Sequence, residues 1–434
     1  MKKSTPAIKR IKPDLPGGFR DYAPADAIAR QEMMDTIRKT FEGFGFDPLQ
    51  TSSVQRTEVL TGGDADSGKI IFNIKGSQEK KSDSSLRFDL TVPLARFVAD
   101  NPDLPKPFKR YQIGTVWRGE RQQQGRYREF IQADVDIVGS SSIDADAEIA
   151  MIIYTVFKNL GIGCFVINYN NRKMLNMLPD FAGFSKNKLW DALRIIDKRD
   201  KIGEDGISEE LQKMFTKTVA DNILRFLSPS SLDILQGKGF TEYGEIATMF
   251  CQNTELDLDA VRKIFKLERY LVRGLSYYTG SVFEVLLPDA PEIGSVAGGG
   301  RYDGLVTQFT GQNIPAVGAS IGIDRLYAAM EKLGTLKKKQ TLTQVLILQL
   351  DVNLKNEYLA MAQELRNAGI ATALYIGDDM SFQAQLAYAV KKEIPYAVIW
   401  GEREKKRGVV AIKNLAGREQ KEIPRDDLLR YFRK

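Results

Sequence analysis

Basic and aromatic residues gather in the stretch 117–130, where their spacing suits the binding of a phosphate group. Residues 106–128 include seven basic residues and a single acidic one, Glu120, on two strand-like segments joined by a polar loop. A planar guanidinium can bind a phosphate through two parallel hydrogen bonds, and a hairpin would bring Arg118 and Arg126 toward one site. The pattern predicts a phosphate-binding hairpin, with an ordinary solvated basic hairpin as the alternative.

Two further segments carry residues suited to a small ligand. Arg273, Tyr277 and Tyr278 lie in an otherwise apolar stretch, residues 271–278, that we expect to be a strand. Alternation would place Arg273 and Tyr277 on one face and Tyr278 on the other, and core packing is the alternative role for one of the tyrosines. At residues 298–300 we expect a glycine-rich turn, where the lack of side chains permits close approach to a ligand.

The composition restricts the chemistry that is available. The chain of 434 residues contains no histidine, which excludes a histidine general base and histidine metal ligands. Cys164 and Cys251 lack the spacing of a metal site, and we expect both to be free thiols. There is neither a Walker-type loop nor a dinucleotide-binding fingerprint, so any nucleotide should bind on an arginine-rich antiparallel sheet.

Hydrophobic periodicity predicts the elements that must position these residues. Helical spacing predicts helices at 24–43, 143–160 and 324–333. Alternation bounded by turn residues predicts strands at 108–117, 129–138, 281–287 and 316–323. The stretch from about 171 to 267 is helical in pattern and free of chemical motifs. These features predict an antiparallel sheet flanked by helices, with an inserted helical subdomain.

The C-terminal part has a different pattern. Short apolar strands alternate with helices from about residue 342, which predicts crossover units and a largely parallel sheet in a separate small α/β domain at 342–434. Residues 402–434 include 11 basic and 6 acidic residues, whereas the whole chain has a net charge of +6. This concentration of charge favours contact with a phosphate backbone over an ordinary charged surface.

No apolar run approaches the roughly 20 residues that a membrane-spanning helix needs. The basic N-terminal stretch, residues 1–20, has no apolar core of a secretory signal. We therefore expect a cytoplasmic protein without a membrane partner.

Together, the segments 117–130, 271–280 and 297–304 resemble motif 2, the histidine-specific signature and motif 3 of the histidyl-tRNA synthetases, which are class II enzymes. The segments 15–21 (LPGGFRD), 86–91 (LRFDLT) and 319–326 (ASIGIDRL) match the family as well. The resemblance implies an α+β fold whose six-stranded antiparallel catalytic sheet is flanked by helices. It also implies a catalytic domain in two parts (1–170 and 263–335), a helical insertion (171–262) and an anticodon-binding domain (342–434).

The resemblance further implies a reaction and its site. A cytoplasmic homodimer would activate L-histidine with ATP and Mg²⁺ and then transfer the histidine to tRNA(His). The residues implied for ATP are Arg118, Glu120, Arg126, Phe130 and Arg325. Those implied for histidine are Asp89, Thr91, Gln132, Asp136, Arg273, Tyr277 and Tyr278. Arg118 and Arg273 would act in catalysis by stabilising charge at the α-phosphate.

The sequence departs from the usual family pattern at several positions, including Gly119 and Ile131, where some members carry histidine. Ser52 and Gln122 stand where proline is common, and Ser276 stands where aspartate usually precedes the tyrosine pair. None of these removes a presumed reacting group. The rival interpretations are a catalytically silent paralogue that regulates histidine biosynthesis and a pure RNA-binding module. The presence of Arg273 and of the 342–434 region favours the enzyme over the paralogue. An RNA-binding module would leave the set Arg118, Glu120, Arg273 and Arg325 without a purpose.

Overall fold

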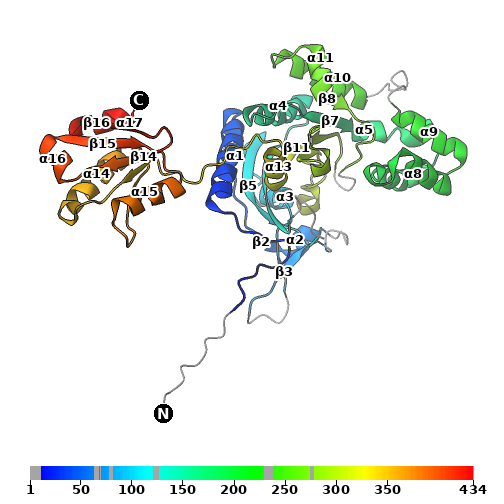
Figure 1. The fold of residues 1–434 in the computed structure, drawn as a ribbon. Coiled ribbons are helices and arrows are strands. Elements are labelled where there is room, and N and C mark those ends of the chain that lie inside the picture. Colours follow the sequence, from blue (N-terminus) through cyan, green and yellow to red (C-terminus); the bar gives the residue numbers. More distant parts are fainter. Residues whose placement is uncertain are drawn as a thin grey trace. The chain divides into compact units, whose positions relative to one another are not determined.

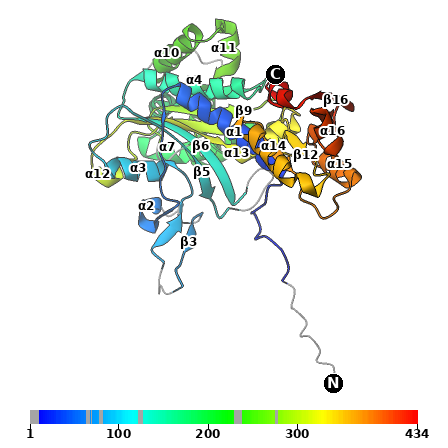
Figure 2. The ribbon, with the colours of Figure 1, turned by 90° about the vertical axis from the view of Figure 1, so that its left-hand side faces the viewer.

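The structure is a computed structural model that describes residues 11–62, 68, 70–77, 82–120, 127–228, 238–273 and 278–433. The chain divides into two compact units: residues 1–20 with 33–336, and residues 21–32 with 337–434. Helix α1 (Pro24–Gly43), at the bounds predicted from its periodicity, begins in the second unit and ends in the first. Each unit has a sheet of its own (Figures 1 and 2).

The first unit contains an eight-stranded sheet in the order β1-β5-β6-β11-β10-β9-β7-β8. From β5 to β7 the six strands pair antiparallel, whereas the edge strands β1 and β8 pair parallel with β5 and β7. The predicted six-stranded antiparallel sheet is confirmed, with a short parallel strand added at each edge. The strands are β1 (Asp47–Pro48), β5 (Phe108–Trp117), β6 (Glu129–Val138), β7 (Val166–Asn171), β8 (Phe265–Leu267), β9 (Ser281–Leu286), β10 (Ala297–Arg301) and β11 (Ala316–Gly322).

Strand β10 shows that the expected glycine-rich turn at residues 298–300 is wrong. All of its residues pair with β11, and all but the last pair with β9. A Cβ at Gly299 would lie 2.2 Å from the carbonyl oxygen of Gly318, and one at Gly300 would lie 2.3 Å from that of Ser281. The glycines allow close approach of neighbouring backbones inside a sheet, which a run of glycines in the sequence does not distinguish from a turn.

The expected strand at residues 271–278 is also wrong in its described part, because residues 271–273 and 278 belong to no strand. The Asn170 side chain donates hydrogen bonds to the carbonyls of Arg269 and Leu271, at 3.0 and 2.9 Å, where a neighbouring strand would otherwise donate. The apolar Val272 is buried among helices instead of on a sheet face.

Helices cover the sheet because each presents a stripe of apolar side chains to it. Helix α4 (Ile143–Asn159) packs against β6 and β11, and it lies between the sheet and α10 (Lys238–Gln252) in both views (Figures 1 and 2). Helix α13 (Ile323–Lys332) also packs on β6 and β11. Helix α3 (Thr91–Asp100) buries Leu94, Ala95 and Val98 in a core with Tyr302. Among the described residues, no helix is both long and apolar enough to cross a bilayer.

The described residues from Arg172 to Ile264 are largely helical, as predicted. They contain α5 (Arg172–Leu175), α6 (Leu178–Ala182), η2 (Lys186–Lys188), α7 (Leu189–Ile196), α8 (Arg199–Met214), α9 (Lys217–Leu227), α10 and α11 (Leu258–Ile264). The buried apolar side chains of α5 to α9 form one core that also includes Val272. A small sheet in the order β2-β4-β3 was not predicted as such; it consists of β2 (Val54–Arg56), β3 (Phe72–Ile74) and β4 (Ser84–Leu86), with α2 (Thr57–Thr61) directly after β2. Two short elements precede and follow β10: η4 (Pro291–Ile293) and α12 (Thr307–Thr310).

The second unit has a five-stranded sheet in the order β13-β12-β14-β15-β16 with apolar clusters that include residues of α14 and α15. Only β13, β12 and β14 are mutually parallel, so the expectation of a largely parallel sheet is correct for that half alone. Strand β16 has one buried residue, Ile423, and therefore shows no hydrophobic alternation. The elements are β12 (Val345–Ile347), η5 (Val352–Leu354), α14 (Lys355–Asn367), β13 (Thr372–Leu374), α15 (Phe382–Lys391), β14 (Tyr396–Ile399), α16 (Glu402–Arg407), β15 (Val409–Asn414), β16 (Glu419–Pro424), η6 (Arg425–Asp427) and α17 (Leu428–Phe432).

Candidate active site

A cavity of about 450 Å³ lies on the central sheet of the first unit. Its walls come from β6, β9, β10 and β11, from the start of α13 and from the chain just after β5. The sequence-predicted residues in the wall are Arg118, Glu120, Phe130, Gln132, Arg273, Tyr278 and Arg325. The structure thus brings together residues that are more than two hundred positions apart in the chain. Arg126 and Tyr277 lie outside the described residues.

Three guanidinium groups surround the cavity. The Nε of Arg118 donates to the carbonyl of Phe88 at 2.9 Å, and its guanidinium lies 5.1 Å from the ring centre of Phe130. Arg325 donates through Nη1 to the carbonyl of Ser295 at 2.8 Å. The bond of Arg118 uses one nitrogen of a group that carries several donors, so its further N–H groups can reach a ligand. The arrangement suits a polyanion beside an aromatic ring.

Glu284 is a cavity residue that the sequence analysis did not identify. Its carboxylate Oε1 lies 2.8 Å from Nη1 of Arg273, and its side chain is buried whereas that of Arg273 is half-exposed. Burial raises the pKa of Glu284, and the charge of Arg273 opposes this rise. The signal in the sequence was an acidic residue inside the apolar strand VFEVL. The ion pair holds the guanidinium of Arg273 at the edge of the cavity.

Gln132 presents an unused acceptor. Its Nε2 donates to the Oγ of Ser320 at 2.6 Å, and its Oε1 is buried without a hydrogen-bond partner among the described residues. A buried polar atom without a partner is costly, so this oxygen is suited to a donor supplied by a ligand. On the same strand, the backbone N–H of Ile131 donates to Asp324 at 2.9 Å, which ties the start of α13, and with it Arg325, to β6.

Asp136 does not reach the cavity wall. It forms an ion pair with the fully buried Arg110 at 2.7 Å and accepts a hydrogen bond from the hydroxyl of Tyr302. Asp134, two residues earlier on β6 and therefore on the same face, is buried too. Burial raises the pKa of Asp134 to about 7, against the opposing charge of Arg110. Asp134 was missed, although its alternation with Gln132 and Asp136 was visible in the sequence.

Asp89 and Thr91 lie at the start of α3 and do not line the cavity either. Asp89 accepts a hydrogen bond from the backbone N–H of Val92 at 3.2 Å. Burial raises the pKa of Asp89 to about 6, and the charge of Arg118 is the largest effect that opposes the rise. A carboxyl group with this pKa is mostly ionised at neutral pH, so it could attract a cationic ligand group.

Comparisons with known proteins indicate the family of this chain. The sequence model of the histidyl-tRNA synthetase family matches residues 18–326, and the model of the anticodon binding domain matches residues 344–434. The chain is 40% identical to the histidine--tRNA ligase of Wolinella succinogenes over 428 residues, covering 95% of this chain and 96% of the relative. It is 38% identical to the histidine--tRNA ligase of Clostridium tetani, covering 98% of both chains.

The fold comparison gives the same result. The crystal structure of histidyl-tRNA synthetase from Nostoc sp. PCC 7120 superposes with a TM-score of 0.82 at 31% identity, covering 98% of this chain and 99% of that one. Sequence and fold agree over nearly the full length, and the chain therefore belongs to the histidyl-tRNA synthetase family, a family of aminoacyl-tRNA ligases.

Proposed function

We propose that this chain activates L-histidine with ATP, forming histidyl-adenylate and pyrophosphate, and then transfers the histidine to tRNA(His). The observation that carries this proposal is the meeting of Arg118, Arg273 and Arg325 around one cavity in a chain of this family. The proposal has a nucleotide half, an amino-acid half and a tRNA-binding part.

In the nucleotide half, Phe130 and Arg325 hold the two faces of the adenine ring, and Glu120 accepts from the adenine amino group. Arg118, which lies beside Phe130, binds the α-phosphate. The position of all four residues in one wall supports these roles. Arg126, which lies outside the described residues, is assigned to the distal phosphates on the family resemblance alone.

In the amino-acid half, Gln132, Asp89 and Thr91 bind the histidine amino group. The unused Oε1 of Gln132 supports this role, because an ammonium group supplies donors and no acceptor. Tyr278, which lines the cavity, and Tyr277 bind the imidazole together with Asp136. Asp89, Thr91 and Asp136 do not line the cavity, and their roles are assigned on the family resemblance.

The side chain of Asp136 is held in place by its buried neighbours. Its carboxylate is held by Arg110 and Tyr302, and a Cβ on Gly318 would lie within 2.0 Å of its Oδ1. This packing leaves Asp136 little rotational freedom, so its charge has a defined position with respect to an imidazole N–H.

The activation step needs no proton transfer by the protein. A histidine carboxylate oxygen attacks the α-phosphorus, the bond between the α-phosphorus and the bridging oxygen breaks, and pyrophosphate leaves with the electron pair. Arg118 and Arg273 stabilise the charge that develops on the α-phosphate oxygens, and the cavity aligns the reactants. An enzyme without histidine can therefore catalyse this reaction.

Mg²⁺ fits this site as an ion bound mainly by phosphate oxygens, because it is commonly held by substrate phosphates plus one or two carboxylates. Of the acidic side chains in the wall, Glu284 pairs with Arg273, and Asp324 accepts from Ile131. The ion would supply charge neutralisation at the phosphates when ATP is bound.

The remaining parts serve the tRNA. We propose that residues 342–434 bind the anticodon, consistent with the domain model that matches them, and that the helical insertion, residues 171–262, contacts the acceptor end. The two catalytic segments are 1–170 and 263–335. The enzyme works as a cytoplasmic homodimer, as is usual in the family.

Histidine-dependent exchange of pyrophosphate into ATP tests the activation step. We expect exchange with histidine and not with other amino acids. Loss of one charge-assisted contact to the transition state in Arg273→Ala should lower kcat by about 100-fold to 1,000-fold. Arg262→Ala is the matched control, because Arg262 is an exposed arginine on α11 whose side chain is 74% accessible. A folded protein that binds ATP without exchange would instead support the silent paralogue.

A further inference from the structure

Arg273 and Tyr278 line the cavity although neither belongs to a strand. Side chains outside the cavity wall hold the two residues in place. One short piece of chain, residues 170–172, contacts the chain both before Arg273 and after Tyr278. Asn170 binds the carbonyls of Arg269 and Leu271, and the backbone N–H of Arg172 donates to the carbonyl of Gly280 at 2.7 Å. The end of β7 therefore holds together the two ends of the signature segment, defined here as residues 269–280.

The first anchor is the side chain of Asn170, which is buried to 99%. Both of its carbonyl partners lie within four residues of Arg273, and its own Oδ1 accepts from the backbone N–H of Asn171 at 2.8 Å. The amide nitrogen donates two hydrogen bonds and the amide oxygen accepts one, so the amide has one orientation. A hydrophobic residue here would remove the side-chain donor from two carbonyls of buried residues, which is unfavourable.

The first anchor continues into the helical region. The Nη1 of Arg269 donates to the carbonyls of Phe226 and Ser228, at 3.0 and 2.6 Å, where α9 ends. The C-terminal end of a helix has exposed carbonyls and a partial negative charge, so a guanidinium is well placed there. Val272, next to Arg273, packs in the core of the same helices. The backbone of Arg273 is thus tied to the helical region as well as to the sheet.

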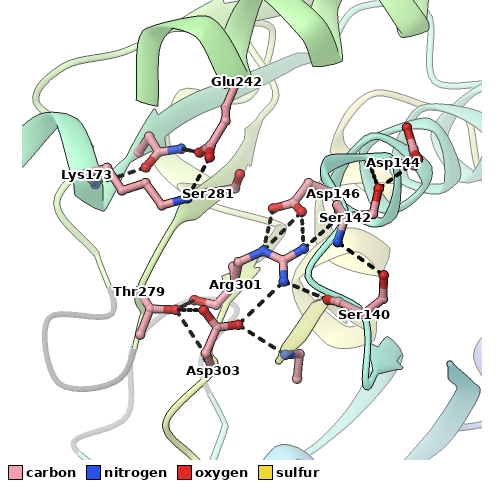
Figure 3. Close-up of polar contacts among 12 residues, drawn as sticks. Ser140, Ser142, Asp144, Asp146, Lys173, Glu242, Thr279, Ser281, Arg301 and Asp303 are labelled. Atoms are coloured by element: carbon pink, nitrogen blue, oxygen red, sulfur yellow. Dashed lines mark hydrogen bonds and ion pairs between the residues drawn. The ribbon is translucent and has the colours of Figure 1, made fainter. Parts of the chain in front are cut away.

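The second anchor holds the residue after Tyr278, as Figure 3 shows. The Oγ1 of Thr279 donates to Asp303 at 2.8 Å, and the backbone N–H of Thr279 donates to the carbonyl of Arg301 at 2.8 Å. The ring of Tyr278 covers Gly300, where a Cβ would approach it to 3.0 Å. Tyr278 is therefore pressed against β10 by contacts on its own ring and on its neighbour.

Arg301 makes this second anchor rigid. Its Nε lies 3.1 Å from Oδ2 of Asp146, and its Nη1 and Nη2 donate to the carbonyls of Ser140 and Ser142 at 2.8 and 3.0 Å (Figure 3). These bonds connect β10 to the start of α4. Since Arg301 and Asp146 are both almost fully buried, water competes little for their contacts.

A third group of contacts braces the end of β7 itself. Glu242 of α10 accepts from the side-chain amide of Asn171 at 2.7 Å and from Lys173 at 2.6 Å (Figure 3). The same amide of Asn171 donates to the hydroxyl of Tyr169, which contacts the Oγ of Ser281 at 3.2 Å. Helix α10 thus supports the strand end that carries the first anchor.

We infer that Asn170 and Thr279 are positioning residues for amino-acid activation, Asn170 through Arg273 and Thr279 through Tyr278. This inference rests on the proposed function. Substitutions of Asn170 and Thr279 should have different kinetic effects, because Arg273 and Tyr278 act at different stages of the reaction. Arg273 stabilises the transition state, so its displacement lowers kcat, whereas Tyr278 binds the imidazole, so its displacement raises KM for histidine.

The test is pyrophosphate exchange by the full chain, with rates divided by the number of active sites titrated from the burst of adenylate formation. A displacement of about 1 Å can cost up to about 100-fold, so Asn170→Ser should lower kcat by about 10-fold or more with KM for ATP unchanged. Thr279→Val, which keeps the shape and loses the hydroxyl, should raise KM for histidine by about 10-fold. Thr279→Ser, which keeps the hydroxyl, should restore the wild-type KM.

Dividing the exchange rates by the number of active sites distinguishes a positioning effect from a loss of folded protein. Variants that lose only active fraction or thermal stability, with wild-type kcat and KM per site, would overturn the inference and leave the proposed function intact. Equal KM values for Thr279→Val and Thr279→Ser would also overturn the role of the Thr279 hydroxyl. A wild-type chain without exchange would instead refute the proposed function, and this inference with it.

Discussion

Replacing Gly299 by alanine should destabilise the first unit, because strand β10 leaves no room for a side chain at this position. The added Cβ would lie 2.2 Å from the carbonyl oxygen of Gly318 and 2.6 Å from the Cα of Ala319, more than 1 Å short of the ordinary contact that begins at 3.4 Å for the oxygen. Both neighbours are backbone atoms of the paired strand β11, so no rotamer change relieves the clash. Overpacking of this kind costs about 1–3 kcal/mol. For a unit of this size, the midpoint of thermal unfolding should fall by on the order of 5 °C.

The neighbouring glycine is a matched control for this prediction. A Cβ at Gly298 would approach only the carbonyl oxygen of Phe283, at 3.4 Å, which is ordinary contact. Gly298→Ala should unfold at the wild-type temperature or slightly above it, since alanine restricts the unfolded chain by about 0.4–1 kcal/mol. Thermal unfolding followed by circular dichroism compares the two variants. Equal midpoints for Gly299→Ala and Gly298→Ala would show that these residues do not form a tightly paired strand.

Three further substitutions test the buried charges. Asp146→Ala should cost about 3–5 kcal/mol in urea denaturation, because it leaves the guanidinium of Arg301 buried without its anion; a loss below about 1 kcal/mol, typical of an exposed pair, would contradict the burial of this contact. Asp134→Asn should stabilise the protein more at pH 8 than at pH 5. Burial raises the pKa of Asp134 to about 7, so the folded state loses stability as the pH rises from the pKa of the unfolded chain through that value. Asparagine cannot ionise and therefore removes this loss. A gain that does not depend on pH would refute the assignment. Tyr302→Phe removes a hydrogen bond that lowers the pKa of Asp136. In the exchange assay, KM for histidine should therefore rise while KM for ATP stays constant. A selective rise in KM for ATP would contradict the proposed role of Asp136.

The sequence by itself determined the elements whose pattern is local. Helix α1 has its predicted bounds, and β5 and β6 begin and end at the predicted residues, because amphipathic periods of 3.6 and 2 are properties of neighbouring residues. Two arginines of the cavity were also visible, since Arg118 lies in a basic cluster and Arg273 interrupts an otherwise apolar stretch. The family resemblance then predicted one six-stranded antiparallel sheet, which the strand order confirms.

Only the tertiary structure decided features that depend on a distant partner. Whether residues 298–300 turn or pair depends on the backbones of β9 and β11, and the strand-like pattern of residues 271–273 is overridden by Asn170, about a hundred positions earlier. The ion pair between Arg273 and Glu284 and the raised pKa of Asp134 depend in the same way on burial by other elements. The burial of a residue and the partners of its hydrogen bonds depend on all of its neighbours in space. A local sequence pattern does not show which distant residues those neighbours are.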